Sequence, residues 1–188
     1  MTEEIIIAGF GGQGVLSMGK ILAYSGIMQD EEVSWMPSYG PEMRGGTANV
    51  TVILSTERIS SPYLKVYDTA IILNQQSMDK FEKTIKPGGV LIYDPNGISH
   101  HPTRTDIKIY QIEGNKLAAE MGNKKIFNMI VLGGFLKIKP IVKLENVIEG
   151  LKKSLPERYH HLIPLNEEAI TKGMMNIIPY KHQKQILS

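Results

Sequence analysis

The sequence has little that would support several common kinds of protein chemistry. It is 188 residues long and contains no cysteine, one tryptophan and only 7% aromatic residues. Without cysteine the chain cannot form a disulfide, ligate zinc through thiolates, hold an iron–sulfur cluster or use a thiol nucleophile. No apolar run approaches the roughly 20 residues that cross a bilayer, and a net charge of +2 does not indicate nucleic-acid binding. We therefore expect neither a membrane nor a nucleic acid as a partner.

Two further absences concern location and metal binding. The chain begins Met-Thr-Glu-Glu, which is acidic rather than basic, so we expect no targeting signal and a cytoplasmic protein. The histidines at 100–101 and 160–161 form adjacent pairs in proline-flanked segments. Because neighbouring side chains tend to diverge, these pairs do not predict a metal site.

What the sequence does contain is an alternation of strand and helix patterns. Strands are predicted at 4–8, 32–35, 47–54, 69–73, 90–93 and 106–112. One helix is predicted to start at 15 and end between 26 and 30, and others at 76–85, 115–120, 127–136, 144–154 and 166–175. Segments rich in proline or glycine at 36–46 and 86–89, and the connection marked by Pro156 and Pro164, are predicted to be irregular.

This alternation predicts an α/β fold: a single Rossmann-like three-layer domain with a mostly parallel sheet and helices on both faces. The length of the chain suits one domain with a substantial core. We expect that domain to cover residues 1–178, followed by a polar C-terminal tail at 179–188.

The most informative stretch runs from Ile5 to Val15 and reads IIIAGFGGQGV. Its glycines satisfy G-x-G-x-x-G, with one glycine in addition, where the first strand meets the first helix. Glycine permits positive φ and close backbone approach, so such a turn can present amide groups and the positive end of a helix to an anion. The candidate anion or ligand loop consists of Gly9, Gly11, Gly12, Gln13 and Gly14. The same glycines also suit a turn that only packs tightly, and both interpretations stay open.

Two specific nucleotide motifs are incomplete in this region. A Rossmann NAD site has an acidic residue at the end of the second strand, to hold the ribose hydroxyls. Here the acids at 30–32 come before that strand, and its far end reads Trp-Met-Pro-Ser. Residues 14–20 match G-x-x-x-x-G-K, but Ile21 stands where a P-loop needs Ser or Thr for magnesium, and the segment lies inside the predicted helix. Any ligand here is therefore expected to be a different phosphate or carboxylate.

A second unusual segment, SYGPEMRGG, runs from Ser38 to Gly46. It places an acid and a base, Glu42 and Arg44, in a loop framed by glycines. Arg44 can form a bidentate pair with a carboxylate or phosphate of a ligand, of Glu42 or of a partner chain. The candidate active-centre or partner-facing loop consists of Tyr39, Pro41, Glu42, Arg44, Gly45 and Gly46. The alternative is a surface turn closed by an internal ion pair.

Four segments together resemble the γ subunits of 2-oxoacid:ferredoxin oxidoreductases, the family that acts on pyruvate, 2-oxoglutarate and branched-chain 2-oxoacids. They are GFGGQGV at 9–15, SYGPEMRGGTA at 38–48, AIILNQ at 70–75 and KPGGVLIYD at 86–94. The resemblance covers about the first 135 residues, and the pair of glycine-rich segments is more specific than either alone. Within the family, the chain is most similar to the γ subunit of a 2-oxoglutarate enzyme.

The resemblance implies oxidative decarboxylation of a 2-oxoacid on thiamine diphosphate, with electrons passing through iron–sulfur clusters to ferredoxin and the acyl group to coenzyme A. It also implies that thiamine diphosphate, magnesium and the clusters are held by the α, β and ferredoxin-like δ subunits. The absence of cysteine and of a G-D-G…N signature in this chain agrees with that division.

The chain is accordingly expected to be a docking subunit that holds no cofactor or metal, supplies no catalytic residue in isolation and is inactive alone. By resemblance, the loop from Pro41 to Gly46 is expected to face the active centre or coenzyme A. Two other classes stay open: an independent NAD(P)-binding enzyme and a purely structural docking domain.

Overall fold

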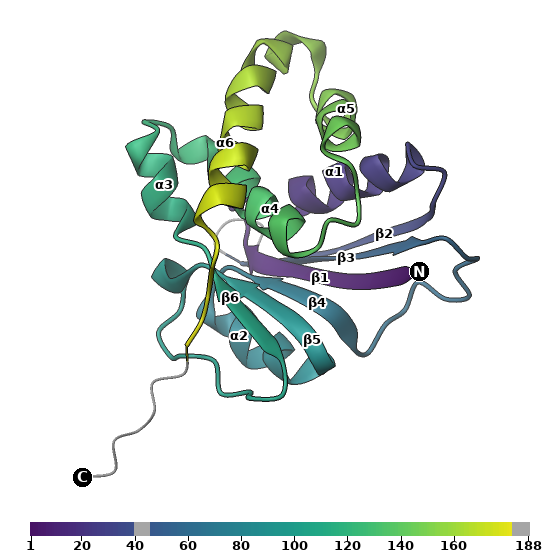
Figure 1. The fold of residues 1–188 in the computed structure, drawn as a ribbon, viewed down its shortest axis with the longest axis vertical. Coiled ribbons are helices and arrows are strands. Elements are labelled where there is room, and N and C mark those ends of the chain that lie inside the picture. The colour runs from purple at the N-terminus through teal and green to yellow at the C-terminus, as the bar shows by residue number, and fades with distance from the viewer. Residues whose placement is uncertain (40–45, 182–188) are drawn as a thin grey trace.

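The computed structural model describes residues 1–39 and 46–181. Its centre is a sheet with the strand order β2-β3-β1-β4-β5-β6-β7 (Figure 1). The strands are β1 (Thr2–Phe10), β2 (Glu32–Tyr39), β3 (Thr47–Ser55), β4 (Tyr67–Ile72), β5 (Ile85–Tyr93), β6 (Lys108–Gln111) and β7 (Ile178–Pro179). The four central strands β1, β4, β5 and β6 are parallel to one another. β3 is antiparallel to both β1 and β2, and β7 is antiparallel to β6.

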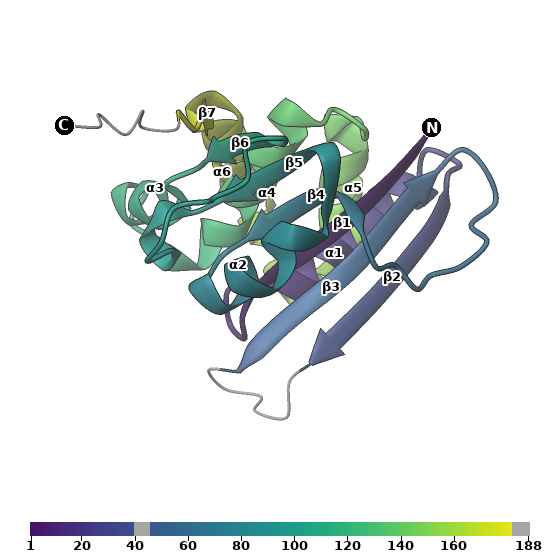
Figure 2. The same ribbon diagram turned by 90° about the horizontal axis from the view of Figure 1, so that it is seen from below.

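Helices cover both faces of this sheet. They are α1 (Val15–Ile27), α2 (Gln75–Phe81), α3 (Gly114–Glu120), α4 (Phe127–Ile138), α5 (Leu144–Ser154) and α6 (Ile163–Asn176). Short 3-10 helices are η1 (Glu82–Thr84), η2 (Pro95–Gly97), η3 (Lys124–Ile126) and η4 (Glu157–Leu162). Figure 1 shows α1, α4, α5 and α6 above the sheet and α2 below it; in Figure 2, β2 and β3 extend beyond α2. The predicted three-layer α/β fold with a mostly parallel sheet is confirmed.

The first strand shows why the core has two parts. Its residues Ile5, Ile6, Ile7 and Ala8 are all completely buried, as expected for a central strand that is covered on both faces. Successive side chains alternate between the faces. Ile5 and Ile7 join the larger cluster with α1 and α4, whereas Ile6 and Ala8 join the smaller cluster with α2. The uninterrupted apolar run is therefore explained by the position of this strand between two helical layers.

The predicted second strand is too short. The sequence places its end at Trp35 and predicts an irregular segment from 36 to 46, but β2 continues to Tyr39 and pairs with β3 along its whole length. Pro37 is accommodated because β2 is an edge strand with a neighbour on one side only, where a missing amide hydrogen costs little. The prediction for 36–39 is wrong, and residues 40–45 lie outside the described part of the chain.

Other elements differ at their ends. The helix predicted at 76–85 stops at Phe81, since η1 follows and Ile85 already belongs to β5. The predicted turn at 86–89 interrupts the pairing of β5 with β4 between Ile85 and Val90. Pro164 lies in the first turn of α6 rather than in an irregular connection, a position where proline removes no helical hydrogen bond.

The beginning of the predicted tail joins the sheet. Pro179 pairs with Tyr110 in β6, and the Tyr180 amide donates a 2.9 Å hydrogen bond to the Ile109 carbonyl. Among the described residues, no helix has the length and apolar character needed to cross a membrane. The same part of the chain contains no group of three His, Asp or Glu side chains that could hold a metal ion.

Candidate functional site

The candidate site lies at the carboxyl edge of the central parallel strands. The chain leaves β1 through α1 on one face of the sheet and leaves β4 through α2 on the other, and β1 and β4 are neighbours. Open α/β sheets bind ligands where adjacent connections diverge in this way, outside the carboxyl ends of the strands. The glycine-rich segment follows β1 and therefore occupies one side of this position.

The turn from Gly9 to Gly14 is closed by its own hydrogen bonds. The Gln13 side chain accepts a 2.6 Å bond from the Phe10 amide through Oε1 and donates a 3.2 Å bond to the Leu73 carbonyl through Nε2. The Gln13 amide donates to the Phe10 carbonyl, and the Gly11 amide donates to the Gly46 carbonyl at 2.9 Å. The amides of Gly11 and Gln13 therefore already have acceptors within the protein. Among the five candidate residues, Gln13 has a clear role in holding the turn against the end of β4.

Glycine is needed in this turn for two different reasons. Gly12 and Gly14 have φ of 94° and 75°, in the left-handed region that other residues avoid. At Gly9 the backbone comes close to its neighbours: a Cβ there would lie 2.5 Å from Gln13 Oε1 and 2.9 Å from Leu73 Cβ. Gly14 also caps α1, and among residues 1–39 and 46–181 no side chain caps this helix end. Within that part of the chain, the first amides of α1 thus lack both a helical acceptor and a side-chain acceptor.

The register of the sheet brings the two segments singled out in the sequence together. Gly9 pairs with Ala48 in β3, and Ala48 pairs with Tyr39 in β2, so these three residues form one row across three strands. The hydrogen bond between Gly11 and Gly46 lies just beyond this row. Tyr39 and Gly46 are therefore placed beside the glycine turn. The remaining residues of the candidate loop, Pro41, Glu42, Arg44 and Gly45, lie outside the described residues.

Two buried polar residues at the ends of β4 and β5 complete this edge. Asn74 is 1% exposed, and its Oδ1 accepts a 2.8 Å bond from the Ser77 amide at the start of α2. Its Nδ2 is buried without a hydrogen-bond acceptor in the described structure, which is uncommon for a buried amide. Asn74 is not among the site residues that the sequence predicts, although its position directly after a buried strand is a signal that could identify it.

Asp94 is fully buried at the end of β5 and anchors two further segments. One carboxylate oxygen accepts bonds from the Asn96 amide and side chain at 2.8 and 3.0 Å, and the other accepts two 3.0 Å bonds from Asn115. Four hydrogen bonds satisfy this carboxylate, so its role is to fix η2 and the start of α3 beside the site. It is not available as a ligand for a bound group.

Tyr93, the residue before Asp94, is not suited to proton transfer near neutral pH. Burial, with a smaller contribution from Tyr180, raises the pKa of Tyr93 to about 12. Its hydroxyl lies 3.1 Å from Gln111 Oε1, and its ring packs edge-on against Tyr180 with centroids 6.0 Å apart. The described part of the site thus supplies hydrogen-bond donors and shape rather than an acid or base.

The geometry defines the class as a Rossmann-like α/β domain with a glycine turn at its switch point, but the turn departs from the NAD-binding arrangement. In that arrangement the second strand adjoins the first, whereas here β3 separates β1 from β2. The far end of β2 carries Ser38 and Tyr39 in place of an acid.

Comparison with known proteins identifies the family. The sequence profile of the pyruvate ferredoxin/flavodoxin oxidoreductase family matches residues 4–175, and the chain belongs to this family. The 2-oxoglutarate synthase subunit KorC of Methanocaldococcus jannaschii is 34% identical over 160 residues, covering 84% of this chain and 86% of the relative. The ketoisovalerate oxidoreductase subunit VorA of Methanothermobacter thermautotrophicus is 39% identical over 130 residues, covering 69% of this chain. The chain spans only 27% of the length of that VorA relative.

Solved structures show the same fold. The γ subunit of a keto/oxoacid ferredoxin oxidoreductase from Geobacter sulfurreducens matches with a TM-score of 0.80 and 26% identity, covering 94% of this chain and 96% of that subunit. A 2-oxoglutarate:ferredoxin oxidoreductase from Magnetococcus marinus, solved with 2-oxoglutarate, coenzyme A and succinyl-CoA bound, matches with a TM-score of 0.83 and 25% identity. The match covers 93% of this chain and 30% of that larger chain. The resemblance found in the sequence is confirmed at the level of the γ-type family.

Proposed function

We propose that this chain is the γ-type component of a multi-subunit 2-oxoacid:ferredoxin oxidoreductase. The complete enzyme would convert a 2-oxoacid and coenzyme A into an acyl-CoA and carbon dioxide, and pass the electrons to ferredoxin. Membership of the family supports this activity, as does the similarity to relatives named as subunits of such enzymes. The chain acts only within the assembly and supplies no catalytic residue in isolation.

The observation that carries the proposal is the contact between the two glycine-rich segments. The Gly11 amide binds the Gly46 carbonyl, and Gly9, Ala48 and Tyr39 share one row of the sheet. The candidate anion loop at 9–14 therefore lies beside Tyr39 and Gly46, the two described ends of the candidate partner-facing loop. A partner chain or an anionic cofactor group that contacts the glycine turn would also lie close to these two residues. Asn74 Nδ2, which has no acceptor in the described structure, is a further donor at this edge.

The chemistry of the chain favours cofactors that are carried by other subunits. With no cysteine it cannot hold an iron–sulfur cluster. Thiamine diphosphate, magnesium and the clusters would belong to α, β and possibly δ subunits, and coenzyme A would be the co-substrate of the complex. In this arrangement the γ chain positions the partner surfaces, and Glu42 and Arg44 contact groups on those partners.

We further propose 2-oxoglutarate as the substrate of the complex. The similarity to KorC extends over most of both chains, whereas the similarity to VorA covers a smaller part of a longer protein. A reconstituted complex would be assayed with 2-oxoglutarate, pyruvate and 2-ketoisovalerate by ferredoxin reduction. A higher kcat/KM for pyruvate or 2-ketoisovalerate would contradict this assignment and leave the γ role intact.

Co-expression with the α and β subunits of the same source tests the role itself. We expect a stable complex that contains this chain, and failure to co-purify would contradict the proposal.

Arg44→Ala is expected to lower turnover of the assembled complex. Arg58→Ala is the matched control, because it changes an exposed arginine that follows β3 at the opposite edge of the sheet. Equal turnover of both variants with intact assembly would show that the loop has only a structural role.

A further inference from the structure

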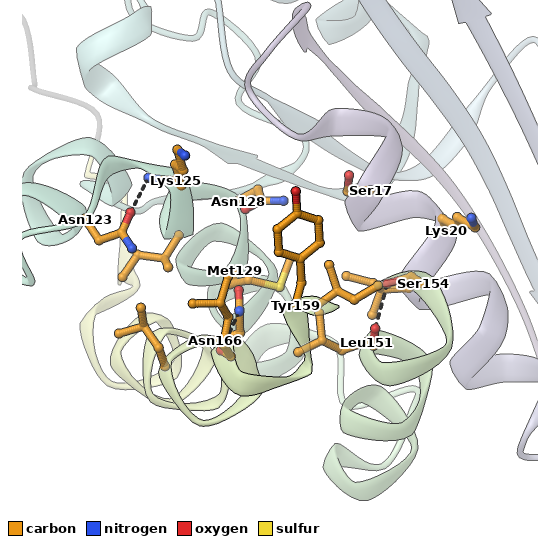
Figure 3. A pocket seen from close by; sticks show the side chains of 15 residues that line it. Ser17, Lys20, Asn123, Lys125, Asn128, Met129, Leu151, Ser154, Tyr159 and Asn166 are labelled. Carbon is orange, nitrogen blue, oxygen red and sulfur yellow. Dashed lines mark hydrogen bonds between the residues drawn. The ribbon is translucent and has the colours of Figure 1, made fainter. Parts of the chain in front are cut away.

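A second concave site lies on the helical side of the molecule, away from the sheet edge. It is a cavity of about 310 Å³ between α1, η3, α4, the end of α5, η4 and α6 (Figure 3). Small-molecule sites typically have volumes of roughly 300–1,000 Å³, so this cavity suits a small ligand. Helix α1, which follows the glycine turn, supplies one wall, and no sequence pattern indicates this cavity.

The charges around the cavity have one sign. Lys20 and Lys125 line it, and none of its fifteen lining residues is acidic. Both lysines are exposed, and neither forms an ion pair with a carboxylate in the described residues. Lys20 makes a cation–π contact, with its Nζ 5.8 Å from the centre of the Tyr24 ring. In Figure 3 the two lysines lie on opposite sides of the cavity, so an anion between them would be attracted by both.

The inner wall is apolar. Ile126, Met129 and Leu151 are at most 3% exposed and form part of the larger core cluster. Leu155, Leu162 and Leu165 extend this surface from the end of α5 to α6. A ligand with a hydrocarbon part would remove this surface from water, and such burial is favourable in proportion to the area covered.

Two hydroxyl groups add polar recognition between these parts. Figure 3 shows Tyr159 crossing the cavity with its hydroxyl directed toward the side where Asn128 and Ser17 lie. Neither Ser17 nor the Tyr159 hydroxyl has a hydrogen-bond partner among the described residues, whereas Ser154 and Asn166 already bond to backbone carbonyls. Asn128 Nδ2 lies 3.5 Å from the Gly14 carbonyl, so one lining residue also contacts the glycine turn.

We propose that this cavity binds a small amphipathic anion, a medium-chain carboxylate, with its head group between Lys20 and Lys125 and its alkyl chain along Met129, Leu155 and Leu162. The ligand would be distinct from the 2-oxoacid of the proposed reaction, which has a short and strongly polar skeleton. Because Asn128 contacts Gly14 at the start of α1, ligand binding in the cavity would also change the surroundings of the glycine turn.

Octanoate, with its neutral analogue octanamide, is the probe for this site. The full chain is labelled with ¹³C at the methionine methyl groups, and the Met129 resonance is followed during titration. We expect saturable binding of octanoate with a shift of Met129, and at least tenfold weaker binding of octanamide. Shortening the chain to hexanoate should weaken binding by about fourfold per methylene that loses burial.

The charge requirement is tested with the double variant Lys20→Gln/Lys125→Gln. It should weaken octanoate binding at least tenfold, while the control double variant Lys65→Gln/Lys83→Gln, whose exposed lysines do not line the cavity, should bind like the unmodified chain. The proposal is overturned if octanoate leaves Met129 unshifted, if octanamide binds as tightly, or if the cavity variant and its control bind equally. Because binding is measured on the chain alone, failure here is independent of the proposed role in the complex.

Discussion

Replacing Gly14 by alanine tests the structural account of the glycine turn. Gly14 has φ of 75°, so an alanine there must adopt the left-handed conformation, which costs about 1–2 kcal/mol. Its Cβ would also lie 2.6 Å from Cγ and 2.7 Å from Cβ of Asn128. Asn128 Cβ is fixed to α4 and cannot rotate away, so α1 or α4 must shift. Overpacking of this kind typically costs about 1–3 kcal/mol. Adding the two costs, we expect Gly14→Ala to lower the free energy of unfolding by about 2–5 kcal/mol.

Gly12→Ala is the matched control. Gly12 has φ of 94°, but a Cβ at this position would meet no atom of the described residues within 4 Å. The variant therefore has the conformational cost alone, about 1–2 kcal/mol. The difference between the two alanine variants isolates the contact with Asn128.

Urea unfolding of the single variants and of a Gly14→Ala/Asn128→Gly double variant provides the assay. Asn128→Gly removes the atoms that the new methyl group would meet, so the double variant should be more stable than the sum of the single changes predicts, by about 1–3 kcal/mol. Equal stability of Gly14→Ala and Gly12→Ala, or strict additivity in the double variant, would refute the proposed packing between the glycine turn and α4.

Three further predictions concern parts that hold the domain together. Gly173→Ala should destabilise the domain by more than about 3 kcal/mol in urea unfolding, because a Cβ would overlap the backbone carbonyl of Ile130 where α6 crosses α4; a loss below about 1 kcal/mol would contradict this crossing. Lys139→Met should cost about 1–3 kcal/mol near neutral pH, since it removes the 3.0 Å ion pair of the buried Glu3 carboxylate, and unchanged stability would contradict that contact. Burial raises the pKa of Tyr93 to about 12, so the stability that depends on its protonated form is complete below about pH 10 and is lost as the pH rises toward 12. The Tyr93→Phe variant has no ionisable group here, so between about pH 10 and 12 it should lose up to about 2–3 kcal/mol less unfolding free energy than the unmodified chain. Identical pH profiles of stability for the two proteins would contradict this.

The fold could be predicted largely from apolar patterning. The run from Ile5 to Ala8 is covered on both faces, as an unbroken apolar strand in an α/β domain should be. The prediction for α5, at 144–154, is confirmed at both ends. The strand order could not be derived in the same way. Nothing local in the segment Thr47–Ser55 indicates that it inserts between β1 and β2 as an antiparallel strand.

The errors at element ends have a common physical cause. The sequence predicts breaks at Pro37 and Pro164, because proline disrupts regular structure in the interior of an element. Pro37 lies on an edge strand, and Pro164 lies in the first turn of a helix, where that disruption does not apply. Sequence alone does not reveal which strand lies at an edge, since this depends on the pairing of distant segments.

The candidate site was predicted in part. Both glycine-rich segments were found in the sequence, and their contact through Gly11 and Gly46 required the register of three strands. Asn74 was not selected because a single asparagine after a strand is typical of a helix cap, a role that it also has. The helical-side cavity combines residues from six helical elements, which no local pattern could bring together.

Omission of this chain from a reconstituted enzyme tests the central claim most directly. The α, β and ferredoxin-like subunits are purified separately and assayed for 2-oxoglutarate-dependent reduction of ferredoxin in the presence of thiamine diphosphate, magnesium and coenzyme A. We predict little turnover without this chain, a rise on its addition that saturates at a fixed stoichiometry, and no turnover by the chain alone. Full activity without this chain, or turnover by the isolated chain, would contradict its assignment as an essential γ-type component.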